Sequence, residues 1–298
     1  MGKPFLKWAG GKRQVLDEIK LNLPENMDSI NTYIEPFIGG GAVLFYLLDN
    51  YDFDEVHISD LNPELILCYE ILKTDAGKVI DELKTIIERY PDYNKLEERK
   101  KFYYDIRSKW NKSVGMINDL SKSETIKRVS QMIFLNRTCF NGLFRVNRKG
   151  EFNVPIGDYK KPSFPSSSQL LEVQRSLENV TIHLSSFEEC ISWVRDSTFI
   201  YFDPPYRPIS QTSQFISYSK NDFNDEDQKK LSHTFRNLDS ENVKLLLSNS
   251  DPRNTDIDDL FFDELYHGFN ILRIDAKRSI NSNPEKRGKI TELLIKNY

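Results

Sequence analysis

The most constraining feature of this 298-residue chain is a run of β-branched and aromatic residues that stops at two prolines, Ser197-Thr-Phe-Ile-Tyr-Phe-Asp-Pro-Pro-Tyr206. A run without polar alternation is typical of a strand buried on both faces, as in the centre of an α/β sheet. Consecutive prolines cannot continue a helix or a central strand, so they predict a stiff, extended turn at its carboxyl end. Because ligands of open α/β sheets bind at such ends, we expect Asp203 and Tyr206 to lie in the functional site.

A second strand-like segment, Thr32-Tyr-Ile-Glu-Pro-Phe-Ile-Gly-Gly-Gly41, ends in three glycines before a helical run from Ala42 to Leu48. Glycines let a ligand approach the backbone closely, and free N–H groups at a helix start favour the polar or anionic part of a nucleotide. A short strand, Glu55-Val-His-Ile-Ser59, then leads to Asp60, about 19 residues after the last glycine, where a carboxylate can bind ribose hydroxyls. NAD binding is the competing interpretation, but Leu44 stands where its fingerprint needs a small residue.

The N-terminal segment Phe5-Leu-Lys-Trp-Ala-Gly-Gly-Lys12 has two glycines between a tryptophan and a lysine. It is not a P-loop, because Leu6 replaces the first glycine of that motif and Arg13 stands where Ser or Thr should follow the lysine. The segment is either a turn that approaches a ligand or a glycine turn beside a core tryptophan, and the glycines alone do not separate the two.

The alternation of strands and helices breaks between residues 63 and 165, where three segments carry apolar residues at helical spacing: Glu64–Tyr90, Lys95–Asn111 and Glu124–Arg137. The α/β pattern then returns with helices at Gln169–Glu178 and Glu226–Asp239 and strands at Val180–Leu184, Thr198–Asp203, Val243–Asn249, Phe269–Asp275 and Ile290–Lys296. The last two strands could form an antiparallel edge. We predict a discontinuous α/β domain over residues 1–62 and 165–298, interrupted by a mainly helical domain over residues 63–164.

Charge is distributed unevenly along the chain. Residues 121–161 hold nine Lys or Arg and three Asp or Glu, a net charge of +6, and the total of −4 therefore leaves −10 for the remainder. Such asymmetry is typical of a nucleic-acid surface, although a solvated charged face would have the same composition.

Residues 136–159 combine aromatics, arginines and turn residues around Asn141-Gly142 and Lys149-Gly150. Strand-like alternation around these turns predicts a hairpin or a loop that projects from the helices. Arginine can bind guanine O6 and N7 together, Leu or Pro can contact a thymine methyl, and an aromatic ring can wedge into a base stack. An ordinary hairpin with a solvated arginine is the alternative.

The Asp203-Pro204-Pro205-Tyr206 motif resembles the catalytic motif of the amino-methyltransferases, which move a methyl group from S-adenosyl-L-methionine (AdoMet) to an exocyclic amine. The lone pair of adenine N6 is delocalised into the ring, and acceptors for its two N–H groups draw the nitrogen towards tetrahedral geometry. The Asp203 carboxylate and the Pro204 carbonyl suit this role, and Tyr206 offers a face on which a flipped base can stack. The motif does not name the substrate, since its relatives include RNA and protein-amide methylases.

From Phe5 to the final strand, the motifs and their order resemble the Dam-type DNA adenine-N6 methyltransferases. The matching motifs are Phe-Leu-Lys-Trp-Ala-Gly-Gly-Lys, Glu-Pro-Phe-x-Gly-Gly-Gly, Asp-Leu-Asn, Asn-Gly-Leu-x-Arg-x-Asn, Gly-Glu-Phe-Asn-Val-Pro and Asp-Pro-Pro-Tyr. The resemblance implies an α/β fold with a Rossmann-like AdoMet-dependent methyltransferase sheet, an inserted DNA-recognition domain, and methylation of adenine in GATC within double-stranded DNA.

The resemblance also implies roles for individual residues. Those implied to bind AdoMet are Trp8, Lys12, Glu35, Phe37, Gly39, Asp60, Ser186, Phe187 and Asp203. Those implied to bind DNA are Lys7, Arg137, Phe140, Asn141, Leu143, Arg145, Pro155 and Tyr159, with Phe140 as the intercalating aromatic. Ser186-Phe187 departs from the Asp-Phe of many members, so we expect a weaker hydrogen bond to the cofactor adenine, or one from Ser186 and backbone, with Phe187 still stacking.

Composition bounds the remaining possibilities. Three scattered cysteines and four isolated histidines lack metal-ligand spacing, so we expect no metal and a reducing, cytoplasmic location. No long apolar run predicts a membrane span, and nothing indicates an obligate protein partner. Two alternatives stay open: an RNA adenine-N6 methyltransferase, which should lack the loop at 136–159, and a catalytically silent DNA-binding regulator, which should have a spoiled glycine turn or Asp203.

Overall fold

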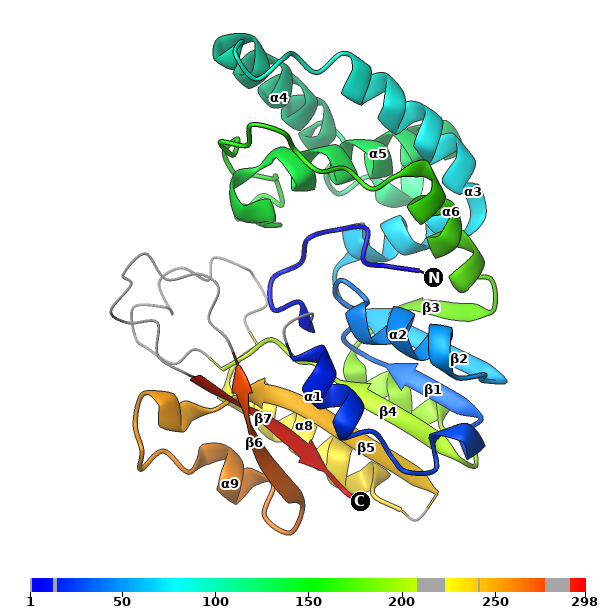
Figure 1. Ribbon diagram of the computed structural model, residues 1–298, viewed down its shortest axis with the longest axis vertical. Helices are drawn as coiled ribbons and strands as arrows, with labels where there is room; N and C mark the ends of the chain where they lie inside the picture. The colour runs from blue at the N-terminus through cyan, green and yellow to red at the C-terminus, as the bar shows by residue number, and fades with distance from the viewer. Residues whose placement is uncertain (1, 13–14, 208–222, 241, 277–289) are drawn as a thin grey trace.

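The computed structural model describes residues 2–12, 15–207, 223–240, 242–276 and 290–298. Within these residues the centre of the molecule is a seven-stranded sheet with the order β3-β2-β1-β4-β5-β7-β6 (Figure 1). The strands are β1 (Thr32–Glu35), β2 (Glu55–Asp60), β3 (Val180–Leu184), β4 (Thr198–Phe202), β5 (Val243–Ser250), β6 (Asn270–Ala276) and β7 (Ile290–Lys296). The predicted α/β fold is confirmed.

The first five strands are parallel, and the chain reverses its order of travel beside β1. It runs outward from β1 to β2 and β3, then returns to place β4 on the other side of β1. This is a topological switch point, and the carboxyl ends of β1 and β4 meet there. Strand β7 is antiparallel to both β5 and β6 and lies between them, so of the last two strands β6 alone is at an edge of the described sheet. Leu293, Leu294 and Ile295 of β7 are fully buried, as an interior position requires.

Helices cover both faces of the sheet (Figure 1). They are α1 (Leu16–Leu21), α2 (Ala42–Asn50), α3 (Pro63–Glu88), α4 (Leu96–Asn111), α5 (Lys122–Thr138), α6 (Ser167–Ser176), α8 (Asp225–Leu238) and α9 (Phe261–Leu265), with short 3₁₀ helices η2 (Met27–Ser29), η3 (Ile117–Asp119), η4 (Phe140–Gly142), η5 (Phe187–Trp193) and η6 (Pro252–Asn254). Side chains of β4 alternate between two cores: Phe199 and Tyr201 join the core beneath α2, α3 and α6, whereas Ile200 and Phe202 join the core beneath α8. No helix in the described ranges has the length and apolar character needed to span a bilayer.

The long helix α3 connects the sheet to the helical part of the molecule. Asn62 caps its start by accepting from the N–H groups of Glu64 and Leu65, and Asp75 (φ −137°, ψ 33°) interrupts it with a kink. It packs on α6 and β3 beside the sheet and on α5 in the helical part. Helix α3 therefore belongs to the packing of both parts.

Arg128, one of the nine basic residues in the 121–161 segment, is buried and has a structural role. The guanidinium of Arg128, 2% exposed, donates to both carboxylate oxygens of Glu64 and to the Trp110 carbonyl, and it stacks 4.0 Å from the centre of the Trp110 ring. Burial of an arginine requires such complete pairing. The positive surface of the segment is correspondingly smaller than its composition implies.

Residues 139–159 form a loop rather than a regular hairpin. Two isolated antiparallel bridges, Cys139 to Ile156 and Val146 to Phe152, hold its sides together. Asn141 adopts left-handed backbone angles (φ 54°, ψ 12°), the conformation that its Asn-Gly turn predicts. The loop projects from the end of α5 towards the sheet (Figure 1).

Candidate active site

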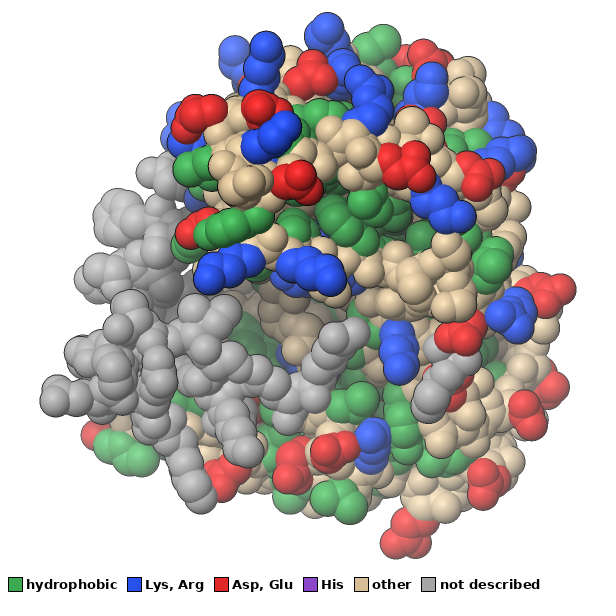
Figure 2. Space-filling view, turned by 45° about the horizontal axis from the view of Figure 1, so that its top comes forward, with side chains coloured by type: hydrophobic (Ala, Val, Ile, Leu, Met, Phe, Trp, Pro, Cys, Tyr) green, Lys and Arg blue, Asp and Glu red, His purple; other side chains and the backbone are tan. Residues whose placement is uncertain are grey.

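A cavity of about 1200 Å³ opens where β1, β2 and β4 end. Its walls come from the N-terminal segment, the glycine turn, the residues after β2 and β4, and part of the 139–159 loop. Figure 2 looks onto this hollow and shows Lys and Arg side chains on the rim that the helical part contributes. The cavity thus lies at the switch point, where the topology places ligand sites.

Asp203 follows β4 and lies in this cavity at the centre of a polar network. Its Oδ1 is 2.7 Å from Lys12 Nζ and accepts a hydrogen bond from Ser248 Oγ at 3.1 Å. Tyr201 donates in turn to Ser248 Oγ at 2.9 Å. Burial raises the pKa of Asp203 above its usual range, and the Lys12 ammonium and the Ser248 hydroxyl oppose that rise. One carboxylate oxygen is thereby engaged by the protein.

Tyr206 is held on one face and at its hydroxyl. Lys12 Nζ lies 4.2 Å from the centre of its ring, and the hydroxyl donates to Glu292 Oε2 of β7 at 2.6 Å. Burial, together with the charges of Asp203 and Glu292, raises the pKa of Tyr206 well above its usual range, so the phenol stays neutral. The aromatic ring has a defined orientation beside Asp203.

The glycine turn after β1 is too crowded for side chains. Gly39 and Gly41 have left-handed φ values of 46° and 70°, and a Cβ on Gly39 would lie 3.0 Å from Cδ1 of Trp8. A Cβ on Gly41 would lie 2.5 Å from the Tyr69 hydroxyl, which donates to the Gly39 carbonyl. Gly41 also caps α2. Trp8 is therefore packed against the turn as part of the cavity wall.

Two carboxylates end the neighbouring strands and line the same cavity. Asp60 accepts from the N–H groups of Gly39 (3.3 Å) and Asn62 (2.9 Å), and burial raises its pKa despite these hydrogen bonds. Glu35 accepts from the Tyr33 hydroxyl at 2.6 Å, and burial raises its pKa well above the usual range. The two groups differ in access to the cavity because Glu35 is fully buried, whereas Asp60 is partly exposed.

Aromatic side chains form another wall. Phe37 stacks on Phe187 with ring centres 5.5 Å apart and meets Phe223 edge-on at 5.6 Å. All three rings line the cavity, and Phe223 was not predicted from the sequence.

Two adjacent serines after β3 differ in orientation. Ser186 accepts from the Glu188 N–H as the cap of η5, donates to the Glu188 carboxylate, and is not part of the cavity wall. Ser185 does line the cavity, and its buried Oγ has no hydrogen-bond partner among the described residues. The side chain of Ser186 caps η5 and lies outside the cavity wall, so its contact with the cofactor stays a prediction.

The residues predicted to contact DNA lie around the start of the 139–159 loop. Asn136 accepts from the Lys7 N–H and donates to the Lys7 carbonyl, which pins the N-terminal segment to α5. Lys7 Nζ lies 4.6 Å from the centre of the Tyr159 ring, and burial and the charge of Arg137 lower its pKa. Burial raises the pKa of Tyr159 above its usual range.

Four other predicted contacts share this loop. The Pro155 carbonyl accepts from the Phe140 N–H, and the Phe140 ring is 52% exposed with Asn141 and Pro155 exposed beside it. Leu143 is half-buried and packs against the core. Phe140 therefore presents an apolar ring on the surface of the loop while its backbone is held by Pro155.

The two arginines predicted to contact DNA have different environments. Arg137 donates from Nε and Nη2 to the Phe5 carbonyl, so it fastens the N-terminal segment to α5 while it lines the cavity. Arg145 is exposed at the cavity rim and donates from Nε to Asn153 Oδ1 at 2.8 Å. That bond orients the guanidinium and does not use its two terminal nitrogens.

Comparison with known proteins decides the family. The family model described as D12 class N6 adenine-specific DNA methyltransferase matches residues 8–280. The chain belongs to this family. It is 50% identical to the type II methyltransferase M.MjaIII of Methanocaldococcus jannaschii, over 99% of both chains. It is 39% identical to M1.LlaDCHI of Lactococcus lactis subsp. cremoris, over 99% of this chain and 95% of the relative. The DNA adenine methylase of Escherichia coli K12 is 34% identical, over 98% and 94%.

The D12-class assignment confirms the predicted resemblance and makes the chain an adenine-specific DNA methyltransferase with a Rossmann-like methyltransferase sheet. In this methyltransferase the cavity gathers Asp203, Pro204 and Tyr206 with every predicted cofactor residue except Ser186. Lys7, Arg137 and Arg145 reach the same cavity, whereas Phe140, Asn141, Leu143, Pro155 and Tyr159 lie on the loop outside its wall.

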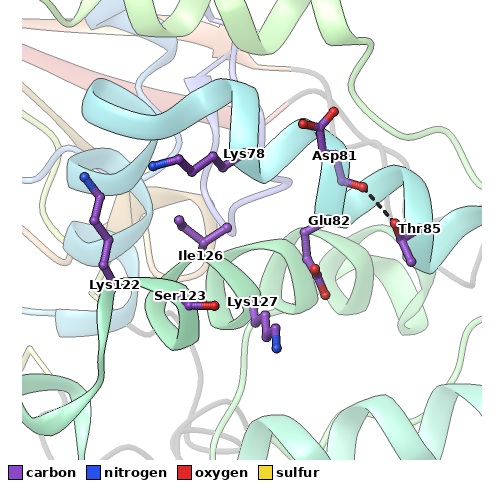
Figure 3. Close-up of a pocket in the computed structure, with 8 residues that line it drawn as sticks. All are labelled: Lys78, Asp81, Glu82, Thr85, Lys122, Ser123, Ile126 and Lys127. Carbon is purple, nitrogen blue, oxygen red and sulfur yellow. Dashed lines mark hydrogen bonds between the residues drawn. The ribbon is translucent and has the colours of Figure 1, made fainter.

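The methyltransferase has a second, smaller hollow between α3 and α5 (Figure 3). Its walls mix Lys78, Lys122 and Lys127 with Asp81 and Glu82. None of these residues lines the larger cavity, so the hollow is separate from the site at the strand ends.

Proposed function

We propose that this enzyme transfers the methyl group of S-adenosyl-L-methionine to N6 of an adenine flipped out of double-stranded DNA, within the sequence GATC. The observation that carries the proposal is the Asp203 carboxylate at the strand end, with one oxygen engaged by Lys12 and Ser248 and Tyr206 beside it. We further propose that it acts in the cytoplasm and without an obligate protein partner.

The cavity residues fit AdoMet in three respects. The glycine turn has no room for side chains and provides the start of α2, which suits the polar part of a nucleoside. Asp60 ends β2 with a carboxylate that can hold the ribose hydroxyls. Ser185 Oγ, which has no hydrogen-bond partner among the described residues, and the stacked Phe187 follow the neighbouring strand β3, where the edge and the face of the cofactor base would meet them.

Activation of the amine follows from where the acceptors point. Bound AdoMet supplies an electrophilic methyl group. Because Asp203 Oδ1 already accepts from Ser248 and Lys12, the other oxygen is left to accept one N6–H bond, and the Pro204 carbonyl accepts the second. These two bonds direct the nitrogen lone pair away from the ring system.

Tyr206 supports the same geometry. Lys12 covers one face of its ring, so a flipped adenine can stack only on the other face. The hydrogen bond to Glu292 prevents the ring from rotating out of this position.

Recognition of duplex DNA is assigned to the 139–159 loop. Arg145 has its terminal nitrogens available for a guanine edge, and Phe140 is exposed where a ring can wedge into the stack. The name of the Escherichia coli relative supports adenine in DNA as the target.

A single experiment tests this function. The purified enzyme is incubated with AdoMet and either unmethylated duplex DNA, single-stranded DNA or RNA, and N6-methyladenine is mapped at single-base resolution. We expect modification of the adenine of GATC in duplex DNA only. Methylation of RNA, or of a duplex at adenines outside GATC, would contradict the substrate or the site respectively.

A further inference from the structure

A buried glutamine holds the backbone of the catalytic turn. Gln228 on α8, which is 0% exposed, donates from Nε2 to the Pro205 carbonyl at 3.2 Å. Pro205 is the second proline of the Asp203–Tyr206 motif, and the carbonyl before it belongs to Pro204. No sequence motif pointed to Gln228, because it lies in a polar stretch far along the chain.

A hydrogen bond from Asn249 of β5 sets the orientation of the Gln228 amide. Asn249, also 0% exposed, donates from Nδ2 to Gln228 Oε1 at 3.0 Å and accepts the Ser250 N–H at its own Oδ1. This chain of amides leaves Gln228 Nε2 as the donor towards Pro205. Two fully buried amides are costly unless their hydrogen bonds are made, so their presence indicates a specific arrangement.

Arg207, two residues after Pro205, is also fixed. Ser250 Oγ donates to the Arg207 carbonyl at 3.2 Å, and the Arg207 guanidinium pairs with Asp225 and Asp259 at 2.8 and 2.7 Å. The carbonyls of Pro205 and Arg207 therefore both have donors. Among the described residues none donates to the carbonyl of Pro204.

We propose that Gln228 is a positioning residue for methyl transfer, which fixes the turn so that the Pro204 carbonyl faces the target amine. The proline rings set φ at both positions, so rotation about ψ is the freedom that is left. Gln228 removes that freedom at Pro205, while the ion pair with Lys12 holds Asp203 at the other end. This role rests on the proposed function of Asp203 and Pro204 as acceptors for N6.

The test is Gln228→Glu, which keeps the shape and still accepts from Asn249 but loses the donor when ionised. A misplaced acceptor lowers kcat by on the order of 10- to 100-fold at pH 8, while the KM values for AdoMet and DNA stay at wild-type levels. When the buried carboxyl takes up a proton at lower pH, it can donate to Pro205 again. We therefore expect kcat of the variant to recover towards wild type as the pH falls, a rise that the wild-type profile lacks.

Gln174→Glu is the matched control, since Gln174 of α6 also donates to a backbone carbonyl, that of Lys73 at 3.3 Å, outside the active-site cavity. It should retain the wild-type kcat and pH profile. If Gln228→Glu does not fold, Asn249→Ser, which frees the Gln228 amide, should show a several-fold lower kcat with unchanged KM.

The inference is overturned if Gln228→Glu has the wild-type kcat at every pH, or if its kcat is low without recovery in acid. It is also overturned by a wild-type kcat in the folded Asn249→Ser enzyme. Wild-type protein assayed in parallel distinguishes failure of the proposed function from failure of the proposed role of Gln228. Absence of N6-methyladenine from the wild-type reaction contradicts the proposed function. An active wild type with an unaffected variant contradicts only the role of Gln228.

Discussion

Asp203 forms an ion pair with Lys12, and burial raises the pKa of its carboxyl at the end of β4. Asp203→Ala removes one of the two acceptors proposed for N6, and we expect kcat to fall by roughly 10²- to 10³-fold, as for the loss of a single transition-state hydrogen bond. Transfer of radiolabelled methyl groups from AdoMet to a GATC duplex measures the loss. Circular dichroism of the variant serves as the folding control, and turnover near the wild-type rate in a folded variant would remove Asp203 from the mechanism.

Ser185 and Ser186 offer a comparison of adjacent residues with the same side chain. The Ser185 hydroxyl is buried in the cavity and has no hydrogen-bond partner in the part of the chain that the structure describes, so a hydrogen bond to the cofactor would satisfy it. Ser185→Ala should weaken AdoMet binding about 3- to 10-fold, the equivalent of one neutral hydrogen bond. Ser186→Ala should leave that affinity unchanged. Calorimetric titration with AdoMet decides, and a larger loss for Ser186→Ala would reverse the assignment.

The serine pair also marks the limit of prediction at the scale of residues. Asp203, Asp60 and the glycines could be predicted because a strand that ends in a motif leaves its next side chains at the sheet edge. Which of two neighbouring serines faces the cavity depends on the cap that Ser186 makes with Glu188, a tertiary detail without a motif. Gln228 was missed for the same reason.

Among the elements, the 139–159 loop carries two kinds of basic residue. Arg145 is oriented by Asn153, whereas Lys149 is exposed on the same loop. A guanidinium bound to a guanine edge discriminates against the wrong base by about 1 to 3 kcal/mol. For Arg145→Ala, the methylation rate on GATC and the rates on duplexes changed at the outer base pair should therefore become similar. Lys149→Ala is the control and should weaken all sequences alike, with a shallower salt dependence.

Rates on duplexes that differ by one base measure this prediction. Arg145 would become a backbone contact if Arg145→Ala lowered the rates on cognate and variant duplexes by the same factor. Recognition would then have to rest on other residues of the site, such as Lys7 and Tyr159, whose side chains already contact each other.

Elements with strong local patterns were predicted nearly to their bounds, as β4 and α4 illustrate. The placement of β7 between β5 and β6 could not be predicted, because strand order depends on pairing between distant segments. The kink in α3 could not be predicted either, because the helical spacing of apolar residues continues through Asp75 although the helix packs on different partners on the two sides of the kink.

At the scale of the whole molecule, α3 joins the sheet to the helical part, and Asp75 fastens its kink. Lys122 at the start of α5 and Lys78 both lie 2.8 Å from the Asp75 carboxylate, and their hydrogen bonds hold its pKa well below the usual range. A lowered pKa stabilises the fold above the pH at which the unfolded carboxyl titrates, and that contribution is lost as the pH falls through the folded pKa.

Asp75→Asn should therefore lower the free energy of unfolding at pH 7, by on the order of 1 kcal/mol, because the two lysine partners of the buried carboxylate are exposed to solvent. The difference between wild type and variant should shrink as the pH falls below about 4, the usual range for an unfolded Asp. Urea denaturation across this pH range is the measurement. A difference that is independent of pH would mean that shape, rather than charge, matters at the kink.

The N-terminal segment, residues 5–12, connects the helical part to the active-site cavity. Lys7 is bound to Asn136 through both of its backbone groups, Trp8 covers the glycine turn, and Lys12 reaches Asp203. In a chimaera that takes residues 63–164 from a relative but keeps this segment, the foreign loop would pack against residues 5–12 that do not match it. Because Lys12 of that segment pairs with Asp203, poor packing there would also displace the Asp203 carboxylate. We therefore expect sequence specificity to transfer between relatives only when residues 5–12 and residues 63–164 are exchanged together.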